Sequence, residues 1–440
     1  MTIKRYYSIF LFCIGCAFFF ATCDTVNNLD PDYKNYFVRY FGEEGDQQGV
    51  DLIINETDNS LILLGTTTNG QTSRLFLVKS DWNGNVIWKR TLGGPSDVAK
   101  DIETANDGGY IILAETLGLG NDADVKLLKI SSAGDKIDSV VYGSPLKDGR
   151  YANEFPVSVT ALGDGYIVTG STDIDTTRAG LGLPNFSDIM HLRFDEALNR
   201  DVGFITYSSN STIEYGVRAE PVSSGGIFLF GSSFTSSSSS DASLTDFNFW
   251  FFDVNQLGLP QGHGGAFGND DAGNDEILKA ICPALTPGYF LVGTYTNTAS
   301  LNTRDMYVAR VTQDTETNGD IIYRKVQGDR RIVITGSSGN RKIEPVAVCQ
   351  SSVGRQGYII LGNEGESNAR NIWISKVDDL GIELLWSASF GALGGNDDTA
   401  GMVGELPDGS IVVVGTVNLG DENILKMALF KLSREGRFAR

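Results

Sequence analysis

The sequence predicts an all-β fold, a seven-bladed β-propeller of four-stranded blades closed by its N-terminal strand. Three observations predict it. A unit of four short strands recurs along the chain, the second strand of every copy ends in the same kind of residue pair, and a lone fourth-strand segment precedes the first complete unit. Radial repetition of four-stranded sheets is how a β-propeller protects its strand edges.

The clearest copy of the unit is residues 101–143. Its first strand, residues 102–105, is followed by the turn NDGG, because Asn and Gly tolerate positive φ. Residues 110–116 form a continuous apolar run, as expected of a strand buried on both faces. A third strand follows at residues 125–130, then the turn SAGD and a fourth strand that ends at Tyr142.

The second strand gives the register of the repeat, because each copy ends with a small residue followed by a small or polar one. The seven pairs are Gly65-Thr66, Ala114-Glu115, Gly170-Ser171, Gly231-Ser232, Gly293-Thr294, Gly362-Asn363 and Gly415-Thr416. A third strand follows each pair, and six of the seven third strands are followed by a fourth.

The seventh copy lacks its own fourth strand, because the chain runs out at residues 437–440. Residues 35–42 (NYFVRYFG) have the fourth-strand ending and no strands before them. We therefore expect the N-terminal strand to complete the last blade, so that residues 35–440 form one closed ring.

The composition limits the partners. The 440 residues are 41% hydrophobic, which is enough for a large core. The net charge of −20 argues against nucleic acid or an anionic lipid surface as a binding partner.

The first 22 residues are predicted to be a lipoprotein signal peptide. Lys4 and Arg5 precede an apolar run, residues 9–21, that is too short for a comfortable membrane span. The run ends in Phe-Ala-Thr-Cys, which resembles a bacterial lipoprotein processing site with Cys23 as the lipidated residue. Cys16 is the rival lipidation site, and an ordinary secretory signal is the other alternative.

Residues 23–34 are predicted to be a lipid-anchored tether. They are polar, and eleven extended residues reach roughly 36–40 Å. The acidic start at Asp24 is compatible with export to the cell surface, and Asp24-Thr25-Val26 matches a short O-glycosylation pattern.

The repeats resemble those of a known family. Residues 81–94 (DWNGNVIWKRTLGG) and 106–116 (NDGGYIILAET) are similar to the propeller repeats of secreted and surface proteins of Bacteroidetes. The resemblance covers nearly everything from Asn35 onward and is strongest in the first two and last two blades. It implies a β-propeller and a life outside the cytoplasm, and it implies no common activity.

The long loops are predicted to gather on one face of the ring. Residues 173–187, 233–246 and 295–304 lengthen the connections between second and third strands in three consecutive blades, and residues 329–342 join blades 5 and 6. These connections share one face in an up-and-down blade, and loops of this kind carry function. The alternative is tolerated insertion, because residues 236–240 are five consecutive serines.

Aromatic and basic residues in or beside these long loops are the candidates for an interaction surface: Phe186, Phe234, Tyr295, Arg304, Arg330 and Arg331. Exposed aromatic rings could also stack on sugars, whereas isolated loop aromatics commonly pack locally.

Few residues are suited to catalysis. The only histidines are His191, predicted to lie on a strand surface, and His263, in a flexible fourth-strand segment. Nothing places an activated serine beside either of them, which argues against a Ser-His-Asp triad and against a zinc or copper site. Cys282 and Cys349 occupy matching first-strand positions and are predicted to be two buried thiols rather than a disulfide.

Acidic residues recur where one blade follows another. Asp270, Asp271, Asp397 and Asp398 are weak candidates for Ca²⁺ ligands, and residues 121–124 (NDAD) are a weaker case. Asp97 occupies a comparable place. The structural alternative is that these carboxylates cap backbone N–H groups at the turns. No other cofactor is predicted.

The sequence lacks the Asp-box turns of sialidases and the tryptophan-docking turns of quinone-dependent dehydrogenases. We therefore expect a non-enzymatic lipoprotein at the outer membrane, on the cell surface rather than in the periplasm. It would be a protein-interaction platform, as an accessory subunit of an outer-membrane complex. The alternative is a surface protein that binds or degrades carbohydrate, since glycosidases need only paired carboxylates.

Overall fold

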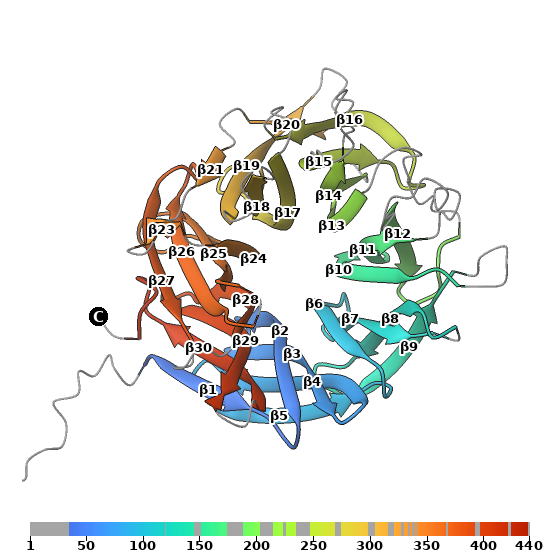
Figure 1. Ribbon diagram of the computed structural model, residues 1–440. Coiled ribbons are helices and arrows are strands. Elements are labelled where there is room, and N and C mark those ends of the chain that lie inside the picture. The colour runs from blue at the N-terminus through green and yellow to red at the C-terminus, as the bar shows by residue number, and fades with distance from the viewer. Residues whose placement is uncertain are drawn as a thin grey trace, which may run out of the picture.

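The structure is a computed structural model that describes most of the chain beyond residue 34. The described residues are 35–118, 120–144, 151–173, 188–202, 214–222, 226–234, 247–268, 274–297, 304–315, 321–326, 330–332, 335–336, 339–340, 342–366, 368–391, 397–420 and 424–438. They form a ring of seven β-sheets around a central opening, with the first and last strands side by side (Figure 1). The predicted seven-bladed propeller is confirmed. None of these residues belongs to a helix of membrane-spanning length and hydropathy.

The strands of each blade follow one another from the centre of the ring outward. Blade 1 contains β2 (Asp46–Asn55), β3 (Ser60–Asn69), β4 (Thr72–Asp81) and β5 (Val86–Leu92). Blade 2 contains β6 (Val98–Thr104), β7 (Tyr110–Leu117), β8 (Ala123–Ile130) and β9 (Lys136–Tyr142). Blade 3 contains β10 (Glu154–Leu162), β11 (Gly165–Thr172) and β12 (Asp188–Asp195), and its predicted fourth strand lies outside the described residues.

The remaining blades keep the same order. Blade 4 contains β13 (Glu214–Pro221), β14 (Ile227–Phe234), β15 (Phe247–Val254) and β16 (Pro260–Phe267). Blade 5 contains β17 (Asn274–Pro283), β18 (Gly288–Asn297), β19 (Arg304–Thr315), β20 (Ile321–Lys325) and β21 (Arg330–Ile332). The short pair β22 (Thr335–Gly336) and β23 (Gly339–Asn340) precedes blade 6, which contains β24 (Ile343–Ser351), β25 (Gly357–Glu364), β26 (Asn371–Asp378) and β27 (Leu384–Phe390).

Blade 7 joins the two ends of the chain. It contains β28 (Thr399–Glu405), β29 (Ile411–Leu419) and β30 (Ile424–Leu432), and its outermost strand is β1 (Phe37–Phe41). β1 runs antiparallel to β30, with Phe37 opposite Lys431 and Phe41 opposite Met427. The N-terminal strand therefore completes the last blade, as predicted.

The chain enters the ring at the face that carries the tight turns. Asn35 and Tyr36 line a hollow of about 540 Å³ together with turn residues of blades 1 and 7, among them Asn59, Asn83 and Gly409. These turns join first to second and third to fourth strands, so residues 35 and 36 lie at the tight-turn face. The strand ends that flank the long connections, such as Thr172 and Asp188, lie at the other face.

The small residue that sets the register of the repeat faces a β-bulge. A Cβ on Gly65 would lie 2.0 Å from the backbone oxygen of Gln48, and one on Gly293 would lie 2.0 Å from that of Ile277. In each of the seven blades the first strand shifts register opposite this position. Glycine is needed in six blades because the bulge brings a carbonyl oxygen against the second strand.

The polar residue that follows the small one ties neighbouring blades together. Thr66 Oγ1 accepts a hydrogen bond from the backbone N–H of Ala99 in the next blade, at 2.9 Å. The same link joins Ser232 to Leu278, Asn363 to Ala400 and Thr416 to Gly49. The repeated pair therefore encodes both the bulge and the contact to the next blade.

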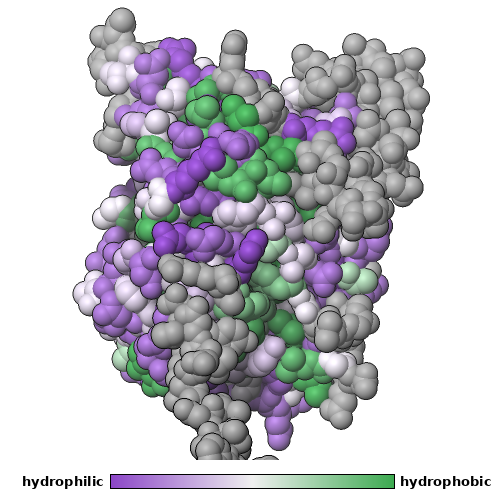
Figure 2. All heavy atoms as spheres, turned by 90° about the vertical axis from the view of Figure 1, so that its left-hand side faces the viewer, coloured by the Kyte–Doolittle hydropathy of each residue, from purple (hydrophilic) through white to green (hydrophobic). Residues whose placement is uncertain are grey.

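The core lies between the blades, which pack face to face. Phe290 of blade 5 stacks on Tyr358 of blade 6 with ring centroids 3.9 Å apart. The apolar clusters each combine residues from neighbouring blades. On the outer side that carries β27 and β1, hydrophilic and apolar residues are interspersed (Figure 2).

Two details differ from the expectation. His191 in β12 is 1% exposed rather than on a strand surface, because neighbouring blades cover both faces of a third strand. Burial lowers the pKa of His191 to about 3, so the ring is neutral. The connection that follows blade 5 is also not wholly a loop, because Arg330–Ile332 pairs with β19 opposite Met306–Val308.

Candidate functional site: the central channel

The central opening is the main cavity that the described first strands share. It holds about 380 Å³ and is lined by residues from β2, β6, β10, β13, β17, β24 and β28. The bulges determine what faces it, because each extra residue and the residue after it turn toward the channel. The extra residues include Lys100, Val157, Val217 and Lys279.

The residue that follows the bulge is polar in four neighbouring blades and apolar in the other three. The polar ones are Asp51, Asp101, Ser158 and Arg218, and the apolar ones are Ala280, Ala347 and Met402. At this position the charged residues are therefore concentrated on one side of the channel.

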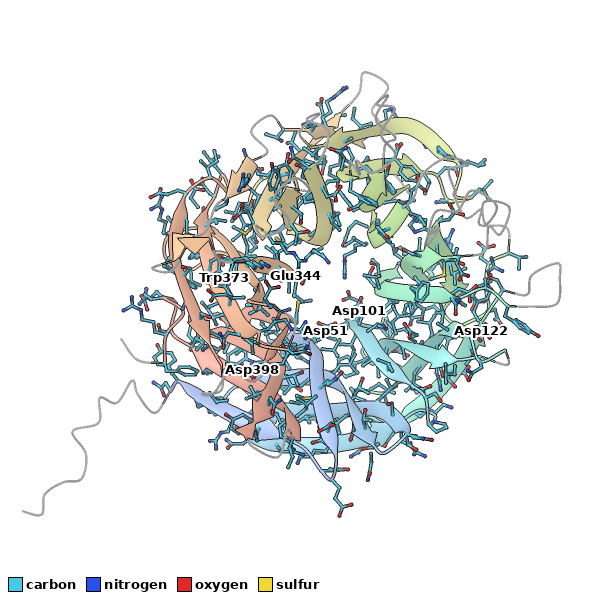
Figure 3. All side chains as sticks on the ribbon, in the orientation of Figure 1. Asp51, Asp101, Asp122, Glu344, Trp373 and Asp398 are labelled. Atoms are coloured by element: carbon cyan, nitrogen blue, oxygen red, sulfur yellow. The ribbon has the colours of Figure 1, made fainter. Side chains whose placement is uncertain are left out.

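Asp51 and Asp101 form a carboxyl pair on this side (Figure 3). They are 4% and 7% exposed. Asp51 Oδ2 accepts the N–H of Ile102, and Asp101 Oδ2 accepts the N–H of Val159, so each carboxyl also holds the next blade. Burial, and then the charge and hydrogen bond of Asp101, raise the pKa of Asp51 well above its usual range.

Arg218 connects blade 4 to blade 2. Its guanidinium donates to Glu220 at 2.7 Å and to Glu103 at 3.0 Å, and it lies 3.7 Å from Asp101. Burial opposes its charge, but the three carboxylates together raise its pKa. Burial also raises the pKa of Glu103. A network of paired charges thus joins the channel walls of blades 2 and 4.

The mouth of the channel at the long-loop face has two different sides. Phe155 is 45% exposed and Tyr215 is 36% exposed, and each is the second residue of its first strand, in blades 3 and 4. Across the mouth, Glu344 pairs with Lys279 at 3.0 Å and with Arg304 at 3.3 Å. One side therefore offers aromatic rings, and the other offers ion pairs.

The channel carboxyls do not have glycosidase spacing. The two acids of a glycosidase lie about 5–9.5 Å apart, with room for a sugar or a water molecule between them. Asp51 and Asp101 instead share a hydrogen bond, and both accept backbone N–H groups of neighbouring blades. Their role in this structure is to join blades.

Three of the predicted surface residues can be placed in full. Tyr295 is 7% exposed and packs in a core cluster, with the Arg331 guanidinium 4.6 Å from its ring centre. Arg331 also donates to Asp305 at 2.6 Å. Arg304 is exposed and paired with Glu344. Local packing thus accounts for Tyr295, whereas Arg304 lies at the channel mouth.

The other candidates are described in part or not at all. Phe234 ends β14 opposite Phe247, and Arg330 pairs with Val308; the side chains of Phe234 and Arg330 are not described. Phe186, Asp270, Asp271 and Cys23 lie outside the described residues, as do most of the long insertions.

Three of the described acidic residues at blade junctions, Asp97, Asp397 and Asp398, make structural contacts. Asp397 accepts the backbone N–H of Arg370 and pairs with its guanidinium at 2.6 Å. Asp398 is fully buried and accepts the N–H of Asn418. Asp97 is fully buried and accepts hydrogen bonds from Gly94 and other groups. The capping alternative thus accounts for Asp97, Asp397 and Asp398.

Cys282 and Cys349 are free thiols, as predicted, because the structure joins them in no disulfide. Burial raises the pKa of Cys349 to about 12 and that of Cys282 well above its usual value. His263 contacts Asp253, with Nδ1 2.8 Å from the carboxylate.

Sequence reasoning missed the channel residues. Asp51, Asp101 and Arg218 lie in first strands, which vary most between copies of the repeat, and nothing local marks them. Aligning the first strands could have found them, because all three occupy the same position in the repeat. That position lies two residues after the first-strand residue that pairs with the small residue of the second strand.

Known proteins show a likeness in fold. No family model and no curated protein matches the chain. A protein of unknown function from Dyadobacter fermentans aligns with 90% of this chain and 97% of its own, at 10% identity and a TM-score of 0.46. An alpha-L-arabinanase from Penicillium chrysogenum aligns with 77% of this chain and 94% of its own, at 12% identity and a TM-score of 0.46.

An alpha-L-arabinofuranosidase from Fusarium graminearum aligns with 90% of this chain and 98% of its own, at 8% identity and a TM-score of 0.43. At these identities and scores the likeness carries no argument about activity. The chain is a β-propeller on the evidence of its own seven sheets.

Proposed function

We propose that the protein is a non-enzymatic binding propeller, held at the outer membrane by a lipid on Cys23, that engages a protein partner with its long-loop face. The observation that carries the proposal is the pair of exposed rings of Phe155 and Tyr215 at the channel mouth. Interface centres are enriched in aromatic residues, because they bury large area with little loss of side-chain entropy.

The entry point of the chain supports the orientation. Asn35 and Tyr36 lie among the tight turns, so a tether before them starts from that face. A lipid on Cys23 would hold the tight-turn face toward the membrane. The long-loop face, with Phe155 and Tyr215, would then point away from the membrane toward a partner in an outer-membrane complex.

The paired charges of the channel support a binding role over a catalytic one. Arg218 is surrounded by carboxylates that satisfy it, and Asp51 and Asp101 hold backbone groups. Groups that are committed to blade contacts do not offer a free acid and base at catalytic spacing.

A second candidate function is carbohydrate binding. The observation that favours it is the same mouth, where Phe155 and Tyr215 face the ion pairs of Glu344. Aromatic rings beside charged hydrogen-bonding groups are also a suitable surface for sugars.

Purification from the native membrane separates the two. We expect stoichiometric co-purification of a membrane protein with the wild-type chain and its loss in a Phe155→Ala/Tyr215→Ala double variant. Tyr40→Ala is the matched control, because Tyr40 is 51% exposed on the outer strand β1. A monomer that binds a glycan through Phe155 and Tyr215 would instead establish the second function.

The anchor has its own test. Labelling with a fatty acid is expected to mark the wild-type chain and a Cys16→Ser variant but not a Cys23→Ser variant, which should leave the membrane fraction. Labelling that depends on Cys16, or no labelling at all, would contradict the anchor proposed here.

A further inference from the structure

We propose that Asp122, Asp124 and Glu154 form a calcium-binding site at the junction between blades 2 and 3. One oxygen from each carboxylate lies within 4.8 Å of one from each of the others. That separation is twice a Ca–O distance of about 2.4 Å, so a single ion between them could contact all three. The site lies away from the central channel, as the label of Asp122 in Figure 3 shows.

The three carboxylates are buried, and none of them forms an ion pair with a described basic side chain. Glu154 is 1% exposed, Asp124 is 6% exposed and Asp122 is 8% exposed. Among the described residues, nothing donates a hydrogen bond of normal geometry to either oxygen of Glu154, to either oxygen of Asp122 or to Oδ1 of Asp124; the hydroxyl and N–H of Ser144 are polar neighbours of Glu154. Isolated buried carboxylates are strongly unfavourable unless they are protonated, paired with a cation or bound to a metal.

Glycines make room for these carboxylates in the surrounding backbone. A Cβ on Gly118 would lie 2.2 Å from the Asp124 carboxylate, and a Cβ on Gly143 would lie 2.3 Å from it. A Cβ on Gly120 would lie 2.6 Å from the carboxylate of Asp122. Three glycines therefore border the cluster.

Another blade junction shows what fills this place when the residues differ. Lys426 in β30 is the counterpart of Asp124 in β8. In each third strand the residue lies two positions before the one that pairs with the small residue of the second strand. Gln47 is likewise the counterpart of Glu154, two residues before the bulge. The Lys426 ammonium contacts Gln47 Oε1 at 2.6 Å and two backbone oxygens at 2.8 Å.

The junction between blades 7 and 1 thus contains a lysine cation bound by oxygens. Between blades 2 and 3 a carboxylate, Glu154, takes the place of the Gln47 side chain, a third carboxylate, Asp122, is added, and the lysine is replaced by aspartate. A bound cation would restore the missing positive charge. Three carboxylate ligands select a hard cation, and buried sites of this kind suit Ca²⁺ better than Mg²⁺, which retains several waters.

Thermal unfolding with Ca²⁺ or with a chelator tests the site. We expect Ca²⁺ to raise the melting temperature of the wild-type chain, and Asp124→Asn and Glu154→Gln each to abolish the shift. Asp135→Asn is the control, because it removes the same charge from an exposed turn of the same blade and should keep the shift. A wild-type protein that does not respond to Ca²⁺, or a shift that survives Glu154→Gln, would overturn the site.

A second variant supplies the cation from the chain. Asp124→Lys copies the lysine of blade 7 and is expected to melt at the same temperature with and without Ca²⁺. Terbium luminescence gives a readout independent of stability, because Tyr142 and Tyr151 lie near enough to sensitise a bound ion. Terbium emission should saturate at one ion per chain and be displaced by Ca²⁺. Displacement by Mg²⁺ at equal concentration would overturn the calcium assignment.

Discussion

The guanidinium of Arg218 in blade 4 lies 3.7 Å from the carboxylate of Asp101 in blade 2, so one side chain reaches past blade 3 along the channel wall. In the same network Arg218 binds Glu103 and Glu220. These contacts join blades 2 and 4, which have no direct strand pairing. The ring is therefore stabilised by contacts between non-adjacent blades as well as by the interfaces between neighbouring blades.

Replacing Arg218 should therefore destabilise the ring. Arg218→Met leaves Asp101, Glu103 and Glu220 without their cation, and breaking a largely buried pair of this kind costs about 3 kcal/mol. Urea unfolding at neutral pH measures the loss. Arg218→Lys should recover part of it, and the deficit of Arg218→Met should shrink in acid, where the carboxylates become protonated. A deficit unchanged by pH would show that packing, not charge, is responsible.

Asp51 should destabilise the protein as the pH rises. Its pKa is raised in the folded state above the ordinary value of 3.8. A raised acid pKa favours the folded state below 3.8, and this contribution is lost as the pH climbs through the folded value. Asp51→Asn loses one of the two acceptors for the N–H groups of Leu52 and Ile102, so it should melt below the wild type in acid. The deficit should shrink as the pH rises to 8, because the variant carries no charge at this position.

Asp81 provides the opposite case. Burial raises its pKa, but hydrogen bonds from Asn85 and Asn83 outweigh burial and lower it. Asp81→Asn should consequently lose stability at neutral pH and approach the wild type in acid. If both variants shift in the same direction, neither carboxylate acts through its charge.

Gly65→Ala should destabilise blade 1. Its Cβ would lie 2.0 Å from the Gln48 oxygen and 2.5 Å from Met427, so the bulge must move, at a cost of about 1–3 kcal/mol. Gly163→Ala is the matched control, because nothing lies within 4 Å of a Cβ there and its φ is not positive. Comparable losses in both variants would count against the bulge as the reason for glycine.

Loss of the closing strand should expose β30. A chain that begins after Gly42 lacks β1, so β30 becomes a free strand edge next to an apolar core, and such edges associate. Light scattering should show oligomers, whereas a chain that begins at Asn35 stays monomeric. A peptide of residues 35–42 added in trans should restore the monomer by strand addition. A stable monomer without β1 and without the peptide would contradict this account of closure.

The repeat predicted the fold because its signals are local. In a pair such as Gly65-Thr66, the glycine indicates a bulge in the opposite strand. The threonine supplies the hydroxyl that accepts a backbone N–H of the next blade. The closing strand could also be predicted, because an isolated fourth strand at the N-terminus can pair only with the blade that lacks one, the last blade.

The candidate site was beyond local reading. Arg218 and Asp101 are 117 positions apart, and their meeting depends on the curvature of blades 2 to 4. The burial of His191 was mispredicted for a related reason. Alternation along a strand predicts one solvent-exposed face, but here neighbouring blades cover both faces of the strand. The acidic junctions were found as a class, yet only the structure separates Asp398, which accepts the N–H of Asn418, from Glu154, whose oxygens accept no hydrogen bond of normal geometry from the described residues.

Pairing between the earliest and the latest strands also sets an order of events. During synthesis or export from N- to C-terminus, Phe37–Phe41 emerges first and waits unpaired until Ile424–Leu432 arrives. The ring can thus close only after β30 has been made. A product truncated before β30 keeps unpaired strand edges, which a quality-control protease can recognise.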